Sequence, residues 1–111
     1  MELTTSTKTL IQTKEKELAE LCRQYHVRRL ELFGSAAGES FDPLKSDLDF
    51  LVVFEPAASL KAGHYADRYF GLRESLEALF SRPVDLVELS AIKNPYFLQA
   101  IQPSRRVLYA A

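Results

Sequence analysis

Apolar residues recur at helical spacing in two long segments of the chain and in one short segment. Between residues 5 and 25 they fall at spacings of seven, three, one and three, which marks one face of a helix. Residues 65–80 have a helical periodicity as well and are predicted to form a second helix. Residues 90–102 indicate a loop and a short helix, because Asn94 is a suitable N-cap and Pro95 suits the first helical position.

Four other segments have the patterns of strands. Two leucines flank a glutamate within residues 27–33, an alternation typical of a half-buried strand. Residues 47–54 contain the apolar run 50–54, which is expected in a central strand that is buried on both faces. Two further strands are predicted at 84–89 and 105–109. The pattern predicts an α/β fold, a small mixed β-sheet with helices packed mainly on one face.

Composition limits the classes of protein to which the chain can belong. Its 111 residues, 47% hydrophobic and 26% charged, predict one globular domain over residues 1–111. A formal net charge of -1 argues against direct nucleic-acid binding, and no apolar run is long enough to span a membrane. No signal peptide is recognisable, so a cytoplasmic location is expected. The single cysteine, Cys22, is interpreted as a core or interface thiol.

Residues 33–54 contain the residues that indicate chemistry. Gly34 and Ser35 leave one predicted strand and open a helical turn, where free N–H groups and a hydroxyl suit phosphate oxygens. Asp47 and Asp49 begin the next strand, and alternation places their carboxylates on the same side, about 7 Å apart. Two such carboxylates favour a cation between them, and a metal beside a phosphate site suggests a nucleotide.

A third acidic residue, Asp85, lies between apolar neighbours in a predicted strand. If the acidic strands are adjacent, Asp47, Asp49 and Asp85 converge, and their repulsion favours a bound metal ion. Because their ligand atoms are all oxygen, Mg²⁺ or Mn²⁺ is favoured over zinc. Two ions about 3.5–4 Å apart would activate a hydroxyl and hold a triphosphate, which implies nucleotidyl transfer. The alternative interpretations are an ordinary polar strand entrance for the aspartate pair and an edge-strand charge for Asp85.

The chain resembles the minimal (MNT-type) nucleotidyltransferases of the DNA polymerase beta-like superfamily. The three motif pieces of that superfamily are present in order as Phe33-Gly34-Ser35, Asp47-Leu48-Asp49-Phe50 and Val84-Asp85-Leu86. The similarity extends to two longer stretches, SLEALFSRPVDLVEL and AIKNPYFLQAI. The resemblance therefore covers nearly the whole chain and implies a single minimal nucleotidyltransferase domain, and the strand order is inferred from it.

The resemblance also implies a role for each site residue. Ser35 and the nearby backbone would bind the β- and γ-phosphates, and Gly34 would let the backbone approach the triphosphate closely. Asp47 and Asp49 would ligate two Mg²⁺ ions. Asp85 would bind the catalytic ion and help to deprotonate the acceptor hydroxyl.

The sequence departs from the family pattern in two places. Eleven residues separate Ser35 from Asp47, one more than is usual, which a loop insertion would absorb. Ala36 and Ala37 stand where many relatives carry an arginine after the Gly-Ser pair. Lys45 could supply a cation instead, although a solvent-facing lysine is the simpler interpretation.

Small members of this family resemble the antitoxins of HEPN/MNT toxin–antitoxin pairs, in which the MNT protein adenylylates a tyrosine of a HEPN-type ribonuclease toxin. The resemblance implies an ATP- and Mg²⁺-dependent protein adenylyltransferase with a HEPN-type partner, and an oligomer with that partner is compatible with it. One alternative is a catalytically weak antitoxin that neutralises its partner by binding alone. Another is a nucleotidyltransferase that modifies a small molecule.

Overall fold

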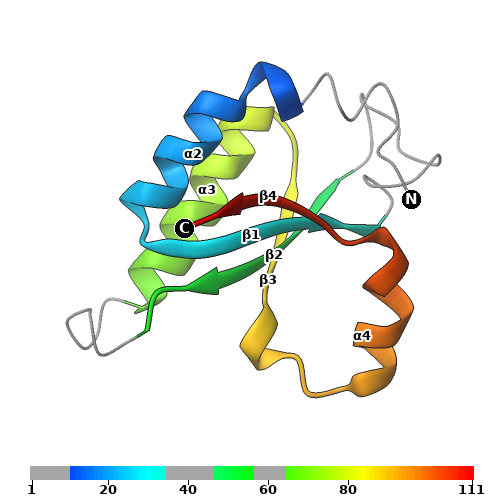
Figure 1. Cartoon of the computed structure of the whole chain (residues 1–111). Coiled ribbons are helices and arrows are strands. Elements are labelled where there is room, and N and C mark those ends of the chain that lie inside the picture. The colour runs from blue at the N-terminus through cyan, green and yellow to red at the C-terminus, as the bar shows by residue number, and fades with distance from the viewer. Residues whose placement is uncertain (1–10, 35–46, 57–64) are drawn as a thin grey trace.

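The computed structural model describes residues 11–34, 47–56 and 65–111. Within these residues one mixed sheet has the strand order β3-β2-β1-β4 (Figure 1). The β1 strand pairs antiparallel with both β2 and β4, whereas β2 and β3 are parallel. The strands are β1 (Val27–Phe33), β2 (Leu48–Phe54), β3 (Val84–Glu88) and β4 (Arg106–Ala110). The predicted α/β fold with a small mixed sheet is confirmed.

Two helices lie side by side on one face of the sheet, and a third lies beyond one end of it (Figure 1). The first two are α2 (Glu15–Gln24) and α3 (Tyr65–Phe80), and the third is α4 (Pro95–Ile101). Two short 3₁₀ turns flank the third helix, η3 (Leu89–Ala91) and η4 (Gln102–Ser104). No helix in the described ranges is long and apolar enough to cross a membrane.

The predicted helix at 5–25 is interrupted. Residues 11–13 are helical, but Lys14, with φ -110° and ψ 12°, separates them from α2. Residues 5–10, where the predicted helix begins, lie outside the described residues. The short helix agrees with its prediction, because the Asn94 side chain accepts a hydrogen bond from the Tyr96 N–H at 2.9 Å and Pro95 occupies the first turn.

Alternation along the strands divides the sheet into a core face and an open face. Leu48, Phe50 and Val52 of β2 are fully buried against the core beneath the helices. Cys22 of α2 is buried in the same core, which raises the pKa of its thiol to about 12 and confirms it as an interior thiol. Asp49 alternates with these β2 side chains and therefore lies on the face opposite the helices.

Among the described residues no strand pairs with the outer edge of β3, and α3 partly covers this edge. The Val84 N–H donates a hydrogen bond to Glu77 Oε2 at 3.1 Å. The Tyr69 hydroxyl donates a hydrogen bond to the Leu86 carbonyl. Side chains thus satisfy backbone groups that an edge strand would otherwise expose to another chain.

The two long helices approach each other closely at a glycine. A Cβ atom on Gly71 would lie 2.6 Å from Cε1 of Tyr25, whose ring packs partly buried against the core. A hydrogen bond of 3.2 Å between the Tyr25 hydroxyl and Ser75 Oγ holds this ring in place. Gly71 therefore leaves the space that Tyr25, the C-cap residue of α2, occupies.

We expect Gly71→Ala to destabilise the protein, although alanine is the better helix former. Crowding against Tyr25 should cost about 1–3 kcal/mol, against a helix gain of about 1 kcal/mol. In a Tyr25→Ala background the same change should stabilise the protein by about 1 kcal/mol. Urea unfolding of the four proteins measures both effects. Equal effects in the two backgrounds would contradict the packing described.

Candidate active site

The parallel pairing of β2 and β3 brings two of the predicted aspartates together. Asp49 is the direct partner of Asp85 in the register, and its neighbour Phe50 is the partner of Leu86. Since Phe50 and Leu86 are in the core, the two carboxylates share the open face of the sheet. Asp47 immediately precedes β2, two residues before Asp49.

The three aspartates form one electrostatic unit although their exposure differs. Asp47 and Asp85 are exposed, whereas Asp49 is half-buried between them. Burial and the negative charges of Asp85 and Asp47 raise the pKa of Asp49 from 3.8 to about 6. Ionisation of Asp49 is therefore less favourable in the folded protein than in water.

Gly34 is required here for a reason that concerns Asp49. Its backbone φ of 74° lies in the left-handed region, which residues other than glycine rarely adopt. A Cβ atom at this position would lie 2.5 Å from Oδ2 of Asp49. The missing side chain makes room for the carboxylate, and the contact of Gly34 with a triphosphate stays a prediction.

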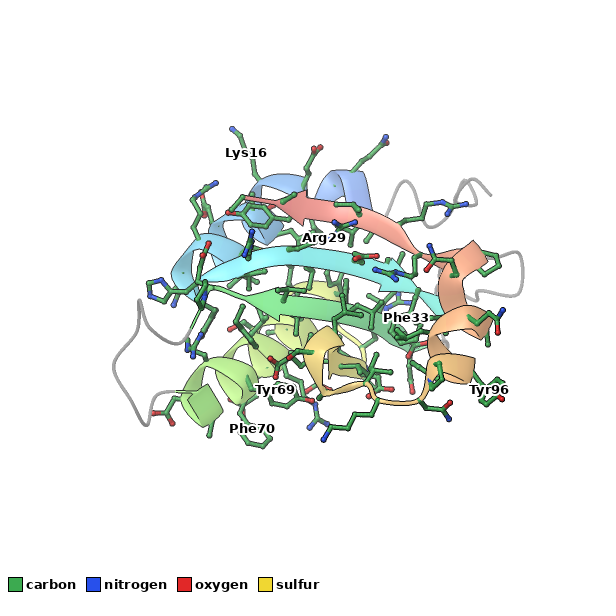
Figure 2. All side chains as sticks on the ribbon, turned by 60° about the horizontal axis from the view of Figure 1, so that its bottom comes forward. Lys16, Arg29, Phe33, Tyr69, Phe70 and Tyr96 are labelled. Carbon is green, nitrogen blue, oxygen red and sulfur yellow. The ribbon has the colours of Figure 1, made fainter. Side chains whose placement is uncertain are left out.

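The chain after α4 supports the Gly34 turn from the side. The Gly34 N–H donates to Ser104 Oγ at 3.1 Å, and the Ser104 hydroxyl donates to the Ile101 carbonyl at 2.8 Å. Phe33 points toward α4 (Figure 2), where its ring meets that of Phe97 edge to face at 6.2 Å. A residue seventy positions away thus binds the N–H of the predicted phosphate turn.

A buried ion pair fixes this support to the sheet. Glu31 of β1 is only 2% exposed, and Arg105 binds both of its carboxylate oxygens at 2.8 and 2.9 Å. Arg29 adds a further contact of 2.9 Å. The hydrogen bonds from Arg105 are the main cause of a lowered pKa for Glu31, which stays ionised. Neither this ion pair nor the contact of Ser104 with Gly34 was predicted from the sequence.

The donor chemistry at the edge fits a hard divalent cation, because the three predicted ligands offer only oxygen. Within the described residues no three acidic, histidine or cysteine side chains are grouped closely enough to hold a metal ion. Asp47 and Asp85 are exposed, so rotation of their side chains can bring the oxygens toward Asp49. Ser35, the other predicted phosphate ligand, lies outside the described residues.

Comparison with known proteins agrees with this geometry. The family model described as "Nucleotidyltransferase domain" matches residues 15–108. A protein of Methanocaldococcus jannaschii, provisionally named a protein adenylyltransferase, is 36% identical over 96 residues, which are 86% of this chain and 87% of that protein. The protein adenylyltransferase MntA of Thermococcus cleftensis is 37% identical over 86 residues, which are 77% of this chain and 76% of MntA.

A solved structure shares the fold. It is the complex of a tri-AMPylated HEPN toxin of Shewanella oneidensis with an MNT antitoxin. The matched chain has a TM-score of 0.59 and 20% identity, and the match covers 90% of this chain and 72% of that one.

The raised pKa of Asp49 predicts how stability depends on pH in buffer free of divalent cations. Because the folded protein binds this proton more tightly than the unfolded chain, the contribution of Asp49 to the free energy of unfolding should fall as pH rises from about 4 to about 6. Solvent around the half-buried carboxylate makes the fall smaller than the full shift implies. Urea unfolding at several pH values measures it.

The variant Asp49→Asn should lose this part of the pH dependence and gain stability relative to wild type at neutral pH. Asp67→Asn, which changes an exposed acid in the first turn of α3, is the matched control and should follow the wild type. A stability difference between Asp49→Asn and wild type that is the same at about pH 4 and about pH 7 would rule out the predicted titration.

Proposed function

Because the chain belongs to the nucleotidyltransferase family, we propose that it transfers AMP from ATP to a hydroxyl group of a partner protein. The observation that carries the proposal is the pairing of Asp49 with Asp85 on the open face, beside the Gly34 turn. This arrangement supplies carboxylates for a cation next to a turn that suits phosphate. The relatives named protein adenylyltransferases support a protein as the acceptor.

The carboxylates of Asp47, Asp49 and Asp85 would hold Mg²⁺. The resemblance to the minimal nucleotidyltransferases implies two such ions. When bound, Mg²⁺ would neutralise charge on the triphosphate and lower the pKa of the acceptor hydroxyl. The raised pKa of Asp49 fits a set of carboxylate ligands whose negative charge a bound cation would stabilise. The side chain of Asp49 is half-buried and lies close to Gly34, whereas the other two aspartates are exposed and would adjust to the substrate.

In the proposed reaction the acceptor oxygen attacks the α-phosphorus of ATP. The bond from that phosphorus to the bridging oxygen breaks, pyrophosphate leaves with both electrons of this bond, and Asp85 accepts the hydroxyl proton. Ser35 and the backbone after it would bind the β- and γ-phosphates. The Gly34 N–H donates to Ser104 and therefore contributes by holding the turn in place.

The proposed acceptor is a tyrosine of a HEPN-type ribonuclease toxin, and the chain would act as its antitoxin. The Shewanella complex, which contains a tri-AMPylated HEPN toxin together with an MNT antitoxin, supports a partner of this kind. Both ATP and Mg²⁺ are abundant in the cytoplasm, where we place the reaction.

Label transfer tests this function. Host lysate incubated with the chain, Mg²⁺ and α-labelled ATP should show a labelled protein, and γ-labelled ATP should not label it, because that phosphate leaves in pyrophosphate. Asp49→Asn should abolish the label, and Asp85→Asn should slow its appearance about 10²–10⁴-fold through loss of the proton acceptor. Glu74→Gln, a change at an exposed acid of α3, should label like wild type.

Absence of any labelled protein with the wild-type chain would refute the proposed transfer. If the chain then still captures a partner, and Asp47→Asn/Asp49→Asn still neutralises that partner in cells, neutralisation operates by binding alone.

A further inference from the structure

A second concave site lies directly beside Asp85. It is an open cavity of about 520 Å³ between the beginning of α3 and the outer edge of β3, and the exposed Ala91 of η3 stands at its far end. Figure 2 shows two of its side chains, Tyr69 and Phe70, which project from neighbouring positions of α3. The cavity is lined by Ala66, Tyr69, Phe70, Asp85, Leu86, Val87, Glu88 and Ala91.

We propose that this cavity binds the aromatic ring of the acceptor tyrosine and presents its hydroxyl at Asp85. The proposal rests on the proposed function, since it names the place where the acceptor of that reaction would bind. The cavity adjoins the candidate active site, because Asp85 lines the cavity and is the register partner of Asp49.

The walls of the cavity suit an aromatic side chain. Apart from the acidic Asp85 and Glu88, the residues that line the cavity are aliphatic or aromatic. Phe70 is 54% exposed and meets the ring of Tyr69 edge to face at 5.1 Å. Further aromatic contacts of this kind contribute about 0.5–1.5 kcal/mol beyond the area that they bury. Phe70 therefore offers a contact surface that the described residues leave more than half exposed.

The polarity changes along the cavity in the direction that a tyrosine requires. Leu86 and Val87 line its middle, and Asp85 stands at the end nearest Asp49. A tyrosine has an apolar ring and a polar tip, so its ring would contact the middle of the cavity while its hydroxyl reaches the carboxylate. A serine or threonine would leave the apolar walls unfilled.

The edge of β3 also indicates how the acceptor would bind. The Val84 N–H and the Leu86 carbonyl already have side-chain partners, Glu77 and Tyr69. An incoming segment therefore cannot use these two groups to add itself as a fifth strand. The occupied groups therefore favour recognition through an inserted side chain.

The acceptor protein identified by label transfer provides the kinetic test. Phe70→Ala should raise the KM for this acceptor roughly 2- to 12-fold, which corresponds to the aromatic contact, and leave the KM for ATP unchanged. Ala91→Phe, which fills the exposed end of the cavity without removing a buried group, should also raise the acceptor KM. Tyr96→Ala, a change at the 79% exposed tyrosine of α4, is the matched control and should leave both values unchanged.

A small probe tests the same site without catalysis. At millimolar concentration, N-acetyl-L-tyrosinamide should shift the NMR signals of Ala66, Val87 and Ala91 in the wild-type protein. The shifts should disappear in Ala91→Phe and persist in Tyr96→Ala.

The remaining outcomes would each overturn the inference, and the measurements distinguish them from one another. Unchanged acceptor kinetics in Phe70→Ala and Ala91→Phe, with label transfer intact, would refute the ring site and leave the proposed function standing. A raised KM for ATP with an unchanged KM for the acceptor would assign the cavity to the adenine base. Probe shifts centred on Tyr96 would place the aromatic site on α4, and a wild-type chain that labels no protein would refute the function and this inference together.

Discussion

The parallel register of β2 and β3 is the constraint on which the candidate site depends. It places Phe50 beside Leu86 on the core face and, one residue earlier, Asp49 beside Asp85 on the open face. A slip of one residue would turn the side chains of one strand to the opposite faces and bring an aspartate into the core. The apolar core thus fixes the position of the two carboxylates.

The magnitudes explain how the fold tolerates two carboxylates that repel each other. Full burial of Leu48, Phe50 and Leu86 contributes about 1.5–3 kcal/mol for each side chain. Repulsion at Asp49 acts on a half-buried group that solvent still screens, so it costs less than its pKa shift alone implies. The free energy gained by burial on the core face exceeds the cost of repulsion on the open face. The repulsion between the carboxylates persists until a cation binds or a proton neutralises one of them.

The C-terminal part of the chain completes the site from the other side. Arg105 neutralises the buried Glu31 and so holds the segment before β4 against β1. The adjacent Ser104 then reaches the Gly34 N–H, and Gly34 in turn leaves room for Asp49. Loss of Arg105 would leave the buried Glu31 with the more exposed Arg29 as its remaining ion-pair partner, and this loss would weaken the arrangement.

The sequence predicts the parts of this arrangement that depend on local pattern. The strand Val27–Phe33 and the helix Tyr65–Phe80 agree with their predicted bounds, because Gly34 and Pro83 mark where they end. The shared side of Asp49 and Asp85 follows from alternation once the strands are adjacent, and that adjacency came from the resemblance.

The contacts that the sequence did not reveal join distant segments. Glu31 alternates with leucines like any polar strand residue, and nothing in the local pattern shows that β4 will cover it. Ser104 is separated from Gly34 by seventy residues, so only the folded chain brings its hydroxyl to that N–H. The interruption at Lys14 likewise lies within a helical pattern that gives no sign of it.

The most direct test of the account is Mn²⁺ binding together with a non-transferable ATP analogue, followed by the paramagnetic broadening of NMR signals. The account predicts broadening centred on the amides around Asp49 and Asp85, and at least about tenfold weaker Mn²⁺ binding in Asp49→Asn and in Asp85→Asn. Glu74→Gln should bind Mn²⁺ like wild type. Broadening centred elsewhere on the chain, or wild-type affinity in both aspartate variants, would contradict the assignment of the cation site to this register.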